Sequence, residues 1–559
     1  MDYKIQIADL ININGIDKQE IIDNITSPKE SGMGDFTLPC FKFSKILRKS
    51  PNIIAVELEK SIPLPEFLDR IEAVNGYLNF YLNNNYFLYQ SVNTILDQSD
   101  RYGSSNIGQG KTICIDYSSV NIAKPFHIGH LSTTVIGAAL YRIYQALGYN
   151  VVGINHLGDW GTQFGKLIVA YKKWGNKAAI EKDGIKELLR LYVKFHDEAE
   201  KDATLLDNGR EWFRKIENGD TEAYEIFDYF KVITLAEVNR VYDRLDIKFD
   251  SYAGESFYND KMTPIIQELE EKKLLIESEG AKVVMLEGMA PCLLMKADGA
   301  TLYATRDMAA AFYRKKTYNF DQCLYVVAYQ QNLHFKQWFE VIRLMGYEWY
   351  NDLKHIAFGM VSLEDGTLST RRGKVVFLEE VLDKAVIKCK KIIEDKNPDL
   401  INKAEVAEQI GVGAVVFSAL INNRIKDIVF SYDKVLNFDG ETGPYVQYTH
   451  ARCNSVLNKA EIGATVDWTG IANPEAAELI RYLARYPEVV EAAATKYEPS
   501  LITRHIVNIA QLFNKFYYEH RIADGEEAIC NARLKLTLAV KTVIANGLRL
   551  LGIKAPDKM

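Results

Sequence analysis

Two histidines with a glycine between them, in His127-Ile128-Gly129-His130, are the residues of this chain best suited to chemistry. Imidazole rings can donate hydrogen bonds to phosphoryl oxygens while negative charge develops on them. The intervening Gly129 lets a flat base or a phosphate approach the backbone closely. From the residue frequencies, a His-x-Gly-His tetrapeptide is expected by chance about 0.01 times in such a chain, so the motif is specific. The alternative is a helix cap that carries two surface histidines.

The elements around this motif are those of a nucleotide-binding sheet. Residues 112–117 predict a β-strand, and the motif opens an amphipathic helix that runs to about Leu147. A helix N-terminus after a strand binds anions, because its free backbone N–H groups and its dipole favour negative charge. A second strand at 151–155 and a helix from about Gly161 extend this to a right-handed βαβ unit. The expected fold class is therefore α/β, with a Rossmann-type doubly wound parallel sheet.

Changes of pattern along the chain suggest three domains. Residues 1–108 have the pattern of a small α/β domain with a strand at 76–82, and the polar stretch 98–111 resembles a linker. Residues 109–436 hold the predicted sheet, interrupted by a charge-rich helical insertion at about 172–290, after which the sheet should resume near Lys296. Residues 437–559 form an all-α domain, with helical periodicity at 445–457, 476–486, 500–518 and 532–551.

The overall composition bounds the class of protein. A chain of 559 residues is too long for a single hydrophobic core, which agrees with about three domains. No run approaches the ~18 apolar residues of a membrane span. The first residues lack a signal-peptide pattern, so a cytoplasmic protein without a membrane partner is expected. The seven cysteines are scattered without Cys-x-x-Cys spacing, so neither zinc, another protein-bound metal nor disulfides are expected. A net charge of −7 still permits a nucleic-acid partner, because binding requires only a local basic face.

Two basic segments are candidates for such a face. Residues 41–49 place four basic side chains at helical spacing: Lys42, Lys45, Arg48 and Lys49. They would contact a phosphate backbone or form an ordinary solvated helix face. Between Phe513 and Arg521 aromatic residues lie beside basic ones, and there Tyr517 and Arg521 are candidates for contacts with single-stranded bases. The alternative is that these aromatic rings belong to the helical core.

Five blocks in order resemble one family, the arginyl-tRNA synthetases, which are class I aminoacyl-tRNA synthetases with a Rossmann-type catalytic domain. The blocks are NIAKPFHIGH (121–130), NHLGDWGTQFG (155–165), LYATRD (302–307), QQNLHF (330–335) and GETGPYVQY (440–448). The first block is similar to the HIGH signature of that family and the last to the entry of its anticodon-binding domain. The resemblance runs almost from end to end of the chain.

The resemblance implies a reaction in two steps. The carboxylate of arginine attacks the α-phosphorus of ATP and pyrophosphate leaves; the arginyl group then passes to the terminal adenosine of the tRNA. The implied partners are ATP, L-arginine and tRNA, with Mg²⁺ carried by the triphosphate rather than by a protein site. The family also implies a monomer, an N-terminal domain (1–108) that touches the outer corner of the tRNA, and an anticodon-binding domain (437–559). Positioning and charge stabilisation would supply most of the rate.

For the ATP site, the resemblance implies His127, Gly129 and His130, with the imidazoles as catalytic groups. The second signature of the family is a lysine-containing loop, and the matching stretch 366–374 has threonines, Thr367 and Thr370, at both lysine positions. Lys124, three residues before His127, could supply the missing catalytic cation on the pyrophosphate side. Further candidates from the loop are Ser369 and Arg371 for ATP binding, with Arg372 and Lys374 beside them.

For the amino acid, the resemblance implies five arginine-binding positions: Asp116, Asn121, Tyr303, Asp307 and Gln331. A guanidinium is a planar, permanently charged fork of donors, so its pocket should offer in-plane carboxylates and amide oxygens. Asp116 ends the first strand of the sheet, where such sheets bind ligands. Asp307 follows Tyr303 by one helical turn. The alternatives are that Asp116 only caps the turn and that Asp307 pairs with Arg306 or Arg314.

Three other functions compete with this interpretation. A class I synthetase for another amino acid would share the HIGH element but not the arginine-binding positions. A small nucleotidyltransferase can also use His-x-Gly-His, but it would leave the helical C-terminal region unexplained. A non-catalytic homologue would bind tRNA yet release no pyrophosphate from ATP.

Overall fold

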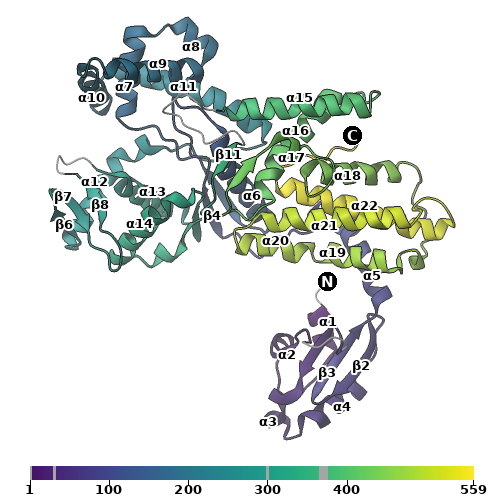
Figure 1. Cartoon of the computed structure of the whole chain (residues 1–559). Coiled ribbons are helices and arrows are strands. Elements are labelled where there is room, and N and C mark those ends of the chain that lie inside the picture. The colour runs from purple at the N-terminus through teal and green to yellow at the C-terminus, as the bar shows by residue number, and fades with distance from the viewer. Residues whose placement is uncertain (1–2, 29–32, 297–300, 364–375) are drawn as a thin grey trace. The chain divides into compact units, whose positions relative to one another are not determined.

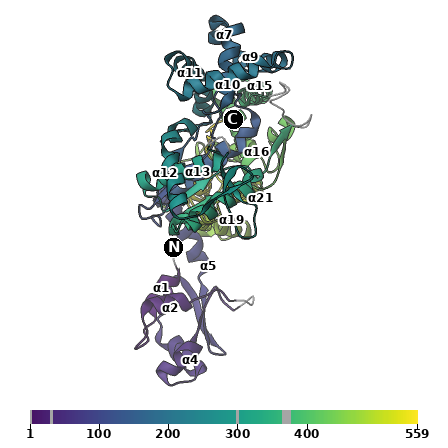
Figure 2. The same ribbon diagram turned by 90° about the vertical axis from the view of Figure 1, so that its left-hand side faces the viewer.

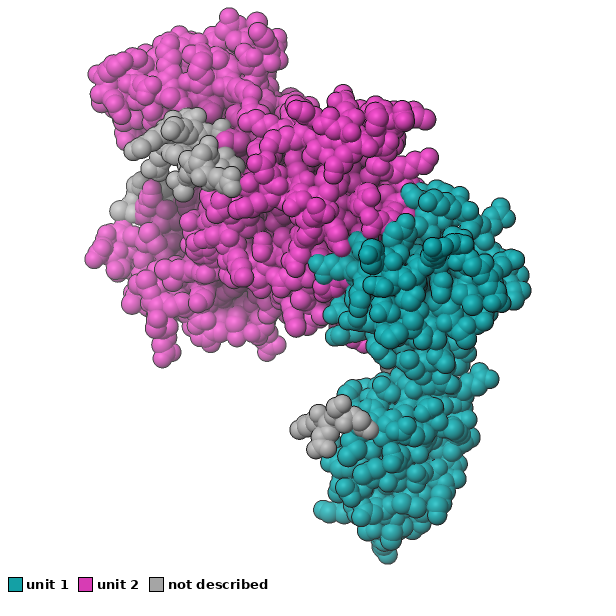
Figure 3. Space-filling view, turned by 45° about the vertical axis from the view of Figure 1, so that its right-hand side comes forward, with its two compact units in different colours: residues 1–102, 453–485, 509–543 teal, residues 103–452, 486–508, 544–559 magenta. Residues whose placement is uncertain are grey.

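The computed structural model describes residues 3–28, 33–296, 301–363 and 376–559 (Figure 1; Figure 2). The chain forms two compact units (Figure 3). Unit 1 comprises Met1–Tyr102, Cys453–Arg485 and Ile509–Val543; unit 2 comprises Gly103–Arg452, Tyr486–Asn508 and Ile544–Met559. The helical C-terminal region therefore contributes residues to both units.

The N-terminal part of unit 1 is a small α/β domain, as expected from the sequence. Its three-stranded antiparallel sheet has the order β1-β3-β2, with β1 (Phe36–Pro39), β2 (Leu68–Val74) and β3 (Tyr77–Leu82). Asn75 and Gly76 join β2 to β3 with φ values of 50° and 82°, the left-handed pair that a tight Asn-Gly hairpin requires. Helices α1 (Tyr3–Leu10), α2 (Lys18–Asn24) and α4 (Pro51–Ser61) contribute to the hydrophobic core of this domain with the sheet.

The helix expected at residues 41–49 is not continuous, and that prediction is wrong. A 3₁₀ turn at Cys40–Phe43 leads into the single-turn α3 (Ser44–Leu47), and Arg48 then takes a left-handed conformation with φ 52°. The break has a local cause: Ser50 caps a new helix that starts at Pro51. A residue before proline disfavours helical geometry, so the first helix has to end earlier.

The central sheet of unit 2 is parallel and doubly wound, which confirms the expected fold class. Its order is β10-β9-β4-β5, with β4 (Thr112–Asp116), β5 (Asn150–Ile154), β9 (Gln322–Tyr325) and β10 (Leu353–His355). Helix α6 (Leu131–Ala146) links β4 to β5. From β4 the chain adds β5 on one side and later β9 on the other. The carboxyl ends of β4 and β9 therefore flank the switch point where such sheets bind ligands.

Between β5 and β9 lies a largely helical insertion (Figure 1). Its helices are α7 (Thr162–Trp174), α8 (Lys177–Asp183), α9 (Ile185–Ala199), α10 (Thr204–Glu217), α11 (Thr221–Arg244) and α12 (Met262–Glu271). A small antiparallel sheet follows, with β6 (Leu275–Ser278), β7 (Ala281–Val284) and β8 (Cys292–Met295). The expectation that the parallel sheet resumes near Lys296 is wrong, because that strand joins the antiparallel sheet instead. A local strand pattern does not specify which partner strand will pair with it.

One face of the parallel sheet packs on α13 (Tyr303–Tyr318) and α14 (Asn332–Leu344). Buried side chains from both layers meet there, including Cys114, Cys323, Met308 and Trp338. The other elements of this region are α15 (Leu378–Lys396), α16 (Lys403–Leu420), α17 (Tyr432–Val435) and the parallel pair β11 (Val361–Leu363) and β12 (Ile428–Phe430).

The C-terminal region is helical, as predicted. It contains α18 (Gly443–Leu457), α19 (Pro474–Ala484), α20 (Tyr486–Thr495), α21 (Ser500–Glu519) and α22 (Glu527–Leu550). Within unit 1, α19 packs on α5 (Asn84–Gln98). None of the helices within the described ranges is long and apolar enough to span a membrane.

Candidate active site

The two histidines lie in a tight turn between β4 and α6. His127 caps a 3₁₀ turn (Ile128–His130), and its Nδ1 accepts a hydrogen bond from the backbone N–H of Gly129 at 3.0 Å. The Nδ1 of His130 in turn accepts from the backbone N–H of His127 at 3.2 Å. The ring centroids are 4.0 Å apart. Because each Nδ1 is an acceptor, both rings carry their proton on Nε2 when neutral.

Burial also keeps these rings neutral. It lowers the pKa of His127 to about 4 and, with the charge of His127, the pKa of His130 to about 3. Near pH 7 the turn therefore presents two neutral Nε2–H donors at a helix N-terminus. Such donors can stabilise negative charge that develops on phosphoryl oxygens.

The segment after residue 375 is hydrogen-bonded directly to the histidine turn. The N–H of Ile128 donates to the carbonyl of Val376 at 3.1 Å, and the N–H of Leu378 donates to the carbonyl of Phe126 at 2.9 Å. His127 and Phe377 form an antiparallel bridge between them. Residues 126–128 and 376–378 thus form a two-stranded seam. The candidates Ser369 and Arg371, like Arg372 and Lys374, lie outside the described residues.

Lys124 lies in the same loop as the histidines and is half-buried. Burial lowers the pKa of its ammonium group, and the charge of Glu255 opposes this shift. Among the described residues, no carboxylate forms an ion pair with Lys124. Within the described part of the site, the Lys124 ammonium group therefore has no direct counter-ion.

Asp116 ends β4, as predicted, and is buried. Its Oδ2 is 2.7 Å from Nη2 of the buried Arg314, and its Oδ1 accepts from Ser119 Oγ at 2.8 Å. The partner suggested for Asp307, Arg314, thus belongs to Asp116 instead. This buried ion pair balances the charge of Asp116 within the protein, so a cationic substrate would be attracted mainly by other carboxylates.

Asp307 and the remaining arginine candidates come from three separate segments of unit 2. The Oδ2 of Asp307 is hydrogen-bonded to Nε2 of His334 at 2.6 Å. Asp307 lies one turn after Tyr303 on α13, as expected. Tyr303 is 68% exposed, and Gln331 is also exposed. Asn121 is half-buried and bridges to Gly158 after β5.

The sequence interpretation missed Glu255. This half-buried carboxyl interacts electrostatically with Arg306, Asp307 and Asp159, and also with Lys124. Burial, together with the negative charges of Asp307 and Asp159, raises the pKa of Glu255 to about 7 despite the opposing charge of Arg306. Two neighbouring acids, one with a raised pKa, suit a cationic ligand that would hold both ionised. The sequence offers only a weak signal for it, an acid between Gly254 and Ser256 in an aperiodic stretch.

The backbone around Glu255 is fixed by Asp159, which is fully buried. The Oδ1 of Asp159 accepts from the N–H of Ser256 at 2.9 Å, and its Oδ2 accepts from Ser256 Oγ at 2.8 Å and pairs with Lys231 Nζ at 2.9 Å. The N–H of Glu255 donates to the carbonyl of Leu157 at 2.9 Å. Asp159, the acid within residues 155–165, therefore holds the backbone at Glu255 in place and is not itself offered to a ligand.

The candidates for nucleic-acid contacts lie on the surface of unit 1. Lys42, Lys45, Arg48 and Lys49 are exposed, and Lys49 pairs with Glu57 at 2.7 Å. Tyr517 on α21 is 39% exposed, and the neighbouring Tyr518 of the same aromatic segment is 87% exposed. Arg521 pairs with Asp524 at 2.8 Å. Phe513 and Phe516 are buried, so the core interpretation holds for these two rings.

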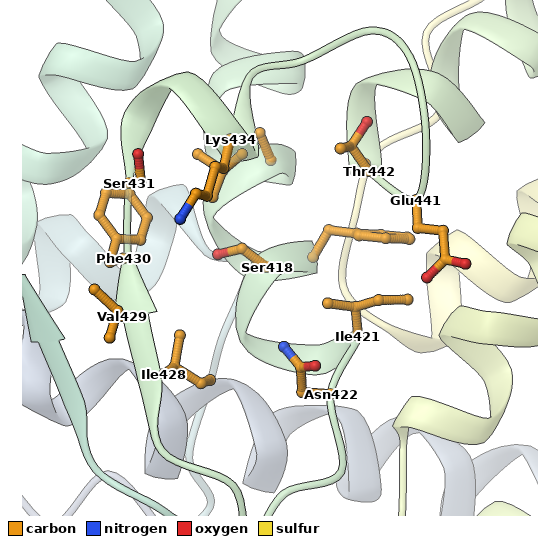
Figure 4. A pocket seen from close by; sticks show the side chains of 14 residues that line it. Ser418, Ile421, Asn422, Ile428, Val429, Phe430, Ser431, Lys434, Glu441 and Thr442 are labelled. Atoms are coloured by element: carbon orange, nitrogen blue, oxygen red, sulfur yellow. The ribbon is translucent and has the colours of Figure 1, made fainter. Parts of the chain in front are cut away.

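A cavity of about 190 Å³ lies away from these residues, between α16, β12, α17 and the start of α18 (Figure 4). Its lining is mainly apolar, and none of the predicted site residues borders it. Lys434 and Glu441 lie on either side of Ser418 in this view (Figure 4). The chemistry argued above is therefore not located in this cavity.

The described residues contain no cluster of three or more His, Cys, Asp or Glu side chains arranged to hold a metal ion. All seven cysteines are buried. Cys114 and Cys323 are opposite each other in the register of the adjacent strands β4 and β9.

Three family descriptions match separate parts of the chain. Residues 91–432 match the catalytic domain of class I tRNA synthetases (R), and residues 446–559 match the DALR anticodon binding domain. Residues 3–82 match the arginyl tRNA synthetase N terminal domain.

Whole-chain relatives agree with these matches. The chain is 54% identical to an arginine–tRNA ligase of Alkaliphilus metalliredigens and 52% identical to one of Clostridioides difficile, with 100% of each chain covered in both cases. The solved structure of Thermus thermophilus arginyl-tRNA synthetase is similar, with a TM-score of 0.78, 26% identity and 96% of each chain covered.

Proposed function

Because this chain belongs to the arginyl-tRNA synthetase family, we propose that the histidine turn is its ATP site and that the acids beside it form its arginine pocket. The protein ligates L-arginine to its tRNA. ATP and arginine first form arginyl-adenylate and pyrophosphate, and the arginyl group then passes to the terminal adenosine of the tRNA. The rival synthetase, nucleotidyltransferase and non-catalytic interpretations are therefore set aside.

In the proposed ATP site, the Nε2–H groups of His127 and His130 donate to phosphoryl oxygens as the α-phosphorus is attacked. Gly129 gives the nucleotide access to the backbone, and Lys124 balances charge on the departing pyrophosphate. The observation that carries this assignment is the pair of Nδ1 acceptors, which leaves both donors available. Ser369 and Arg371 are retained as contributors from the loop. Mg²⁺ would be carried by the triphosphate rather than by a protein site.

In the proposed arginine pocket, Asp307 and Glu255 face the guanidinium. Tyr303 contributes a polar contact from α13, Gln331 from the 3₁₀ turn before α14, and Asn121 from the loop after β4. Asp116 acts at the floor of the pocket, where its pairing with Arg314 fixes both side chains. Lysine offers a point charge rather than a planar fork, so it should satisfy this set poorly.

The two regions outside residues 109–436 have proposed roles with the tRNA. Residues 1–108 would contact the outer corner of the tRNA through Lys42, Lys45, Arg48 and Lys49. Residues 437–559 would bind the anticodon loop, with Tyr517, Tyr518 and Arg521 as candidates. Residues 109–436 would carry the chemistry. The family resemblance also supports a cytoplasmic monomer.

The direct test is ATP–pyrophosphate exchange and tRNA charging with purified protein. We expect exchange with arginine and with no other amino acid. We also expect charging of arginine-specific tRNA. Exchange should be measured with and without tRNA, because the family resemblance leads us to expect activation only when tRNA is present. Exchange with another amino acid in place of arginine would contradict the pocket assignment.

Arginine binding should weaken as the pH falls through 7. Glu255 has a raised pKa of about 7, so it gains a proton below that pH and loses the charge that attracts the guanidinium. The KM for arginine should therefore rise by roughly tenfold per pH unit once the pH is well below 7. Exchange kinetics between pH 5.5 and 8.5 would measure this. The variant Glu255→Gln should give a high KM that no longer depends on pH; a flat wild-type profile would remove Glu255 from the pocket.

Loss of Lys124 should slow activation rather than weaken binding. We expect Lys124→Ala to lower kcat for exchange about 100-fold, because the cation acts on charge that develops only as pyrophosphate leaves. The KM values for ATP and arginine should change by no more than about threefold. Lys124→Arg, which keeps the charge, is the matched control. A normal rate in Lys124→Ala would transfer the cation role to residues 366–374.

A further inference from the structure

The loop that carries Lys124 and leads to the histidines has a strained backbone. Three non-glycine residues in it take left-handed conformations: Ser118 with φ 67°, Ser119 with φ 47° and Ala123 with φ 59°. Such conformations are unfavourable for residues with a Cβ atom, and they persist only where surrounding contacts impose them. The contacts that impose them are therefore part of the machinery that holds the site in shape.

Two of the three strained residues are held by the same helix of the insertion, α11. The backbone N–H of Ala123 donates to Thr234 Oγ1 at 2.9 Å, and Ser118 Oγ lies 2.7 Å from the hydroxyl oxygen of Tyr242. Thr234 and Tyr242 are both buried, and their own second hydrogen bonds are also made within the protein. The third, Ser119, is held locally by Asp116.

The Tyr242 contact belongs to a chain of buried hydrogen bonds that ends at a histidine. Thr134 Oγ1 donates to the carbonyl of His130 at 2.7 Å, and a carbonyl can only accept. Thr134 must therefore accept from Ser118 at 2.9 Å, and Ser118 must accept from Tyr242. Tyr242 in turn accepts from Asn155 Nδ2 at 3.0 Å. Each hydroxyl in this series of hydrogen bonds donates in one fixed direction. Removal of any one hydroxyl therefore leaves a buried neighbouring group without its hydrogen-bond partner.

The Thr234 contact has an equally definite direction. Thr234 donates its own hydroxyl hydrogen to the carbonyl of Phe230 at 2.7 Å, so its oxygen is free to accept from Ala123. Ala123 directly precedes Lys124. The two hydroxyls of α11 thus act on different members of the proposed ATP site, Thr234 on Lys124 and Tyr242 on His130.

We propose that Thr234 and Tyr242 are positioning residues for adenylate formation, which makes α11 a part of the ATP site although neither hydroxyl touches a substrate. The inference rests on the proposed roles of His130 and Lys124. Neither residue makes or breaks a covalent bond. Each holds a backbone segment in the conformation that orients Lys124 or His130.

Isosteric variants separate the hydroxyls from the packing. Tyr242→Phe and Thr234→Val keep the shape of each side chain, and each should lower kcat for exchange roughly tenfold while KM for arginine changes little. Thr234→Ser keeps the hydroxyl and should restore most of the rate. The matched control is Tyr229→Phe on the same helix, because the buried hydroxyl of Tyr229 has no hydrogen-bond partner among the described residues. That variant should be indistinguishable from wild type.

Double variants decide whether each hydroxyl acts through its assigned partner. In a Lys124→Ala background, Thr234→Val should cost almost nothing further, whereas Tyr242→Phe should still lower the rate; in a His130→Ala background the pattern should reverse. Rates are taken per active site, with the folded fraction checked by thermal melting. Full multiplicative losses in both backgrounds, or a loss confined to thermal stability, would overturn the proposal. Wild-type exchange in the same assay tests the proposed function separately.

Discussion

Replacing Asp307 with alanine should raise the KM for arginine about 100- to 1000-fold and leave the KM for ATP within about twofold. A guanidinium cannot lose its proton in the pocket, so removal of Asp307 leaves its charge out of water with Glu255 as the one remaining partner. Breaking such a pair costs about 3–5 kcal/mol, and about 1.4 kcal/mol corresponds to a factor of ten. Asp116 cannot substitute for Asp307, because it is already paired with Arg314 at 2.7 Å.

The measurement is ATP–pyrophosphate exchange at varied arginine and at varied ATP. Asp433→Ala is a suitable control, because Asp433 also pairs with a cation, Lys388 at 2.9 Å, but is highly exposed on the surface. Asp307→Asn tests charge alone, since the amide keeps the shape of the side chain and can still contact His334. Equal rises in both KM values would mean that Asp307 supports the whole site rather than the guanidinium.

Removal of the His130 ring should lower kcat for exchange by about 100- to 1000-fold with little change in either KM. The loss of one preorganised donor has this size where charge develops in the transition state and water is excluded. His130→Gln should recover part of the rate, because its amide N–H₂ reaches toward the position of Nε2. His130→Asn should recover less, because its amide nitrogen falls near Nδ1, which serves as an acceptor in the turn.

The pH dependence of kcat gives an independent check that both histidine rings act in their neutral state. The pKa of His127 is lowered to about 4 and that of His130 to about 3, so neither ring should titrate between pH 5.5 and 8.5. The kcat for exchange at saturating arginine and ATP should therefore show no loss attributable to histidine protonation in that range. A fall in kcat with a midpoint near 6.5 that disappears in His130→Gln would show that burial does not keep the ring neutral.

The sequence is informative wherever the chemistry depends on neighbouring residues. A strand, a turn and a helix that opens with His127 and His130 are adjacent in the chain, so their arrangement at the switch point could be predicted. The spacing of Tyr303 and Asp307 on one helix is predictable for the same reason. Side-chain pairings across long separations are not: Asp116 meets Arg314, and Asp307 meets His334 rather than either suggested arginine.

Two other differences show the same limit. Glu255 becomes a neighbour of Asp307 only through the fold, and no periodicity marks it in advance. The spacing of Lys42, Lys45 and Arg48 suits a helix, yet Ser50 and Pro51 start a new one and end the first. In that case a local signal was present, because proline restricts the residue before it. The hydroxyls of Thr234 and Tyr242 have no distinguishing pattern at all, since most buried threonines and tyrosines in a helix are simply core residues.

The seam between residues 126–128 and 376–378 has a consequence for inhibition. Its two backbone hydrogen bonds, at 3.1 and 2.9 Å, join residues 376–378 to the peptide units on either side of His127. Neither segment can be displaced without moving the other. A compound that separated the two strands would therefore misalign both imidazoles while it occupied neither the nucleotide nor the amino-acid subsite. Inhibition of that kind would be non-competitive toward ATP and arginine alike, and rising cellular levels of either substrate would not relieve it.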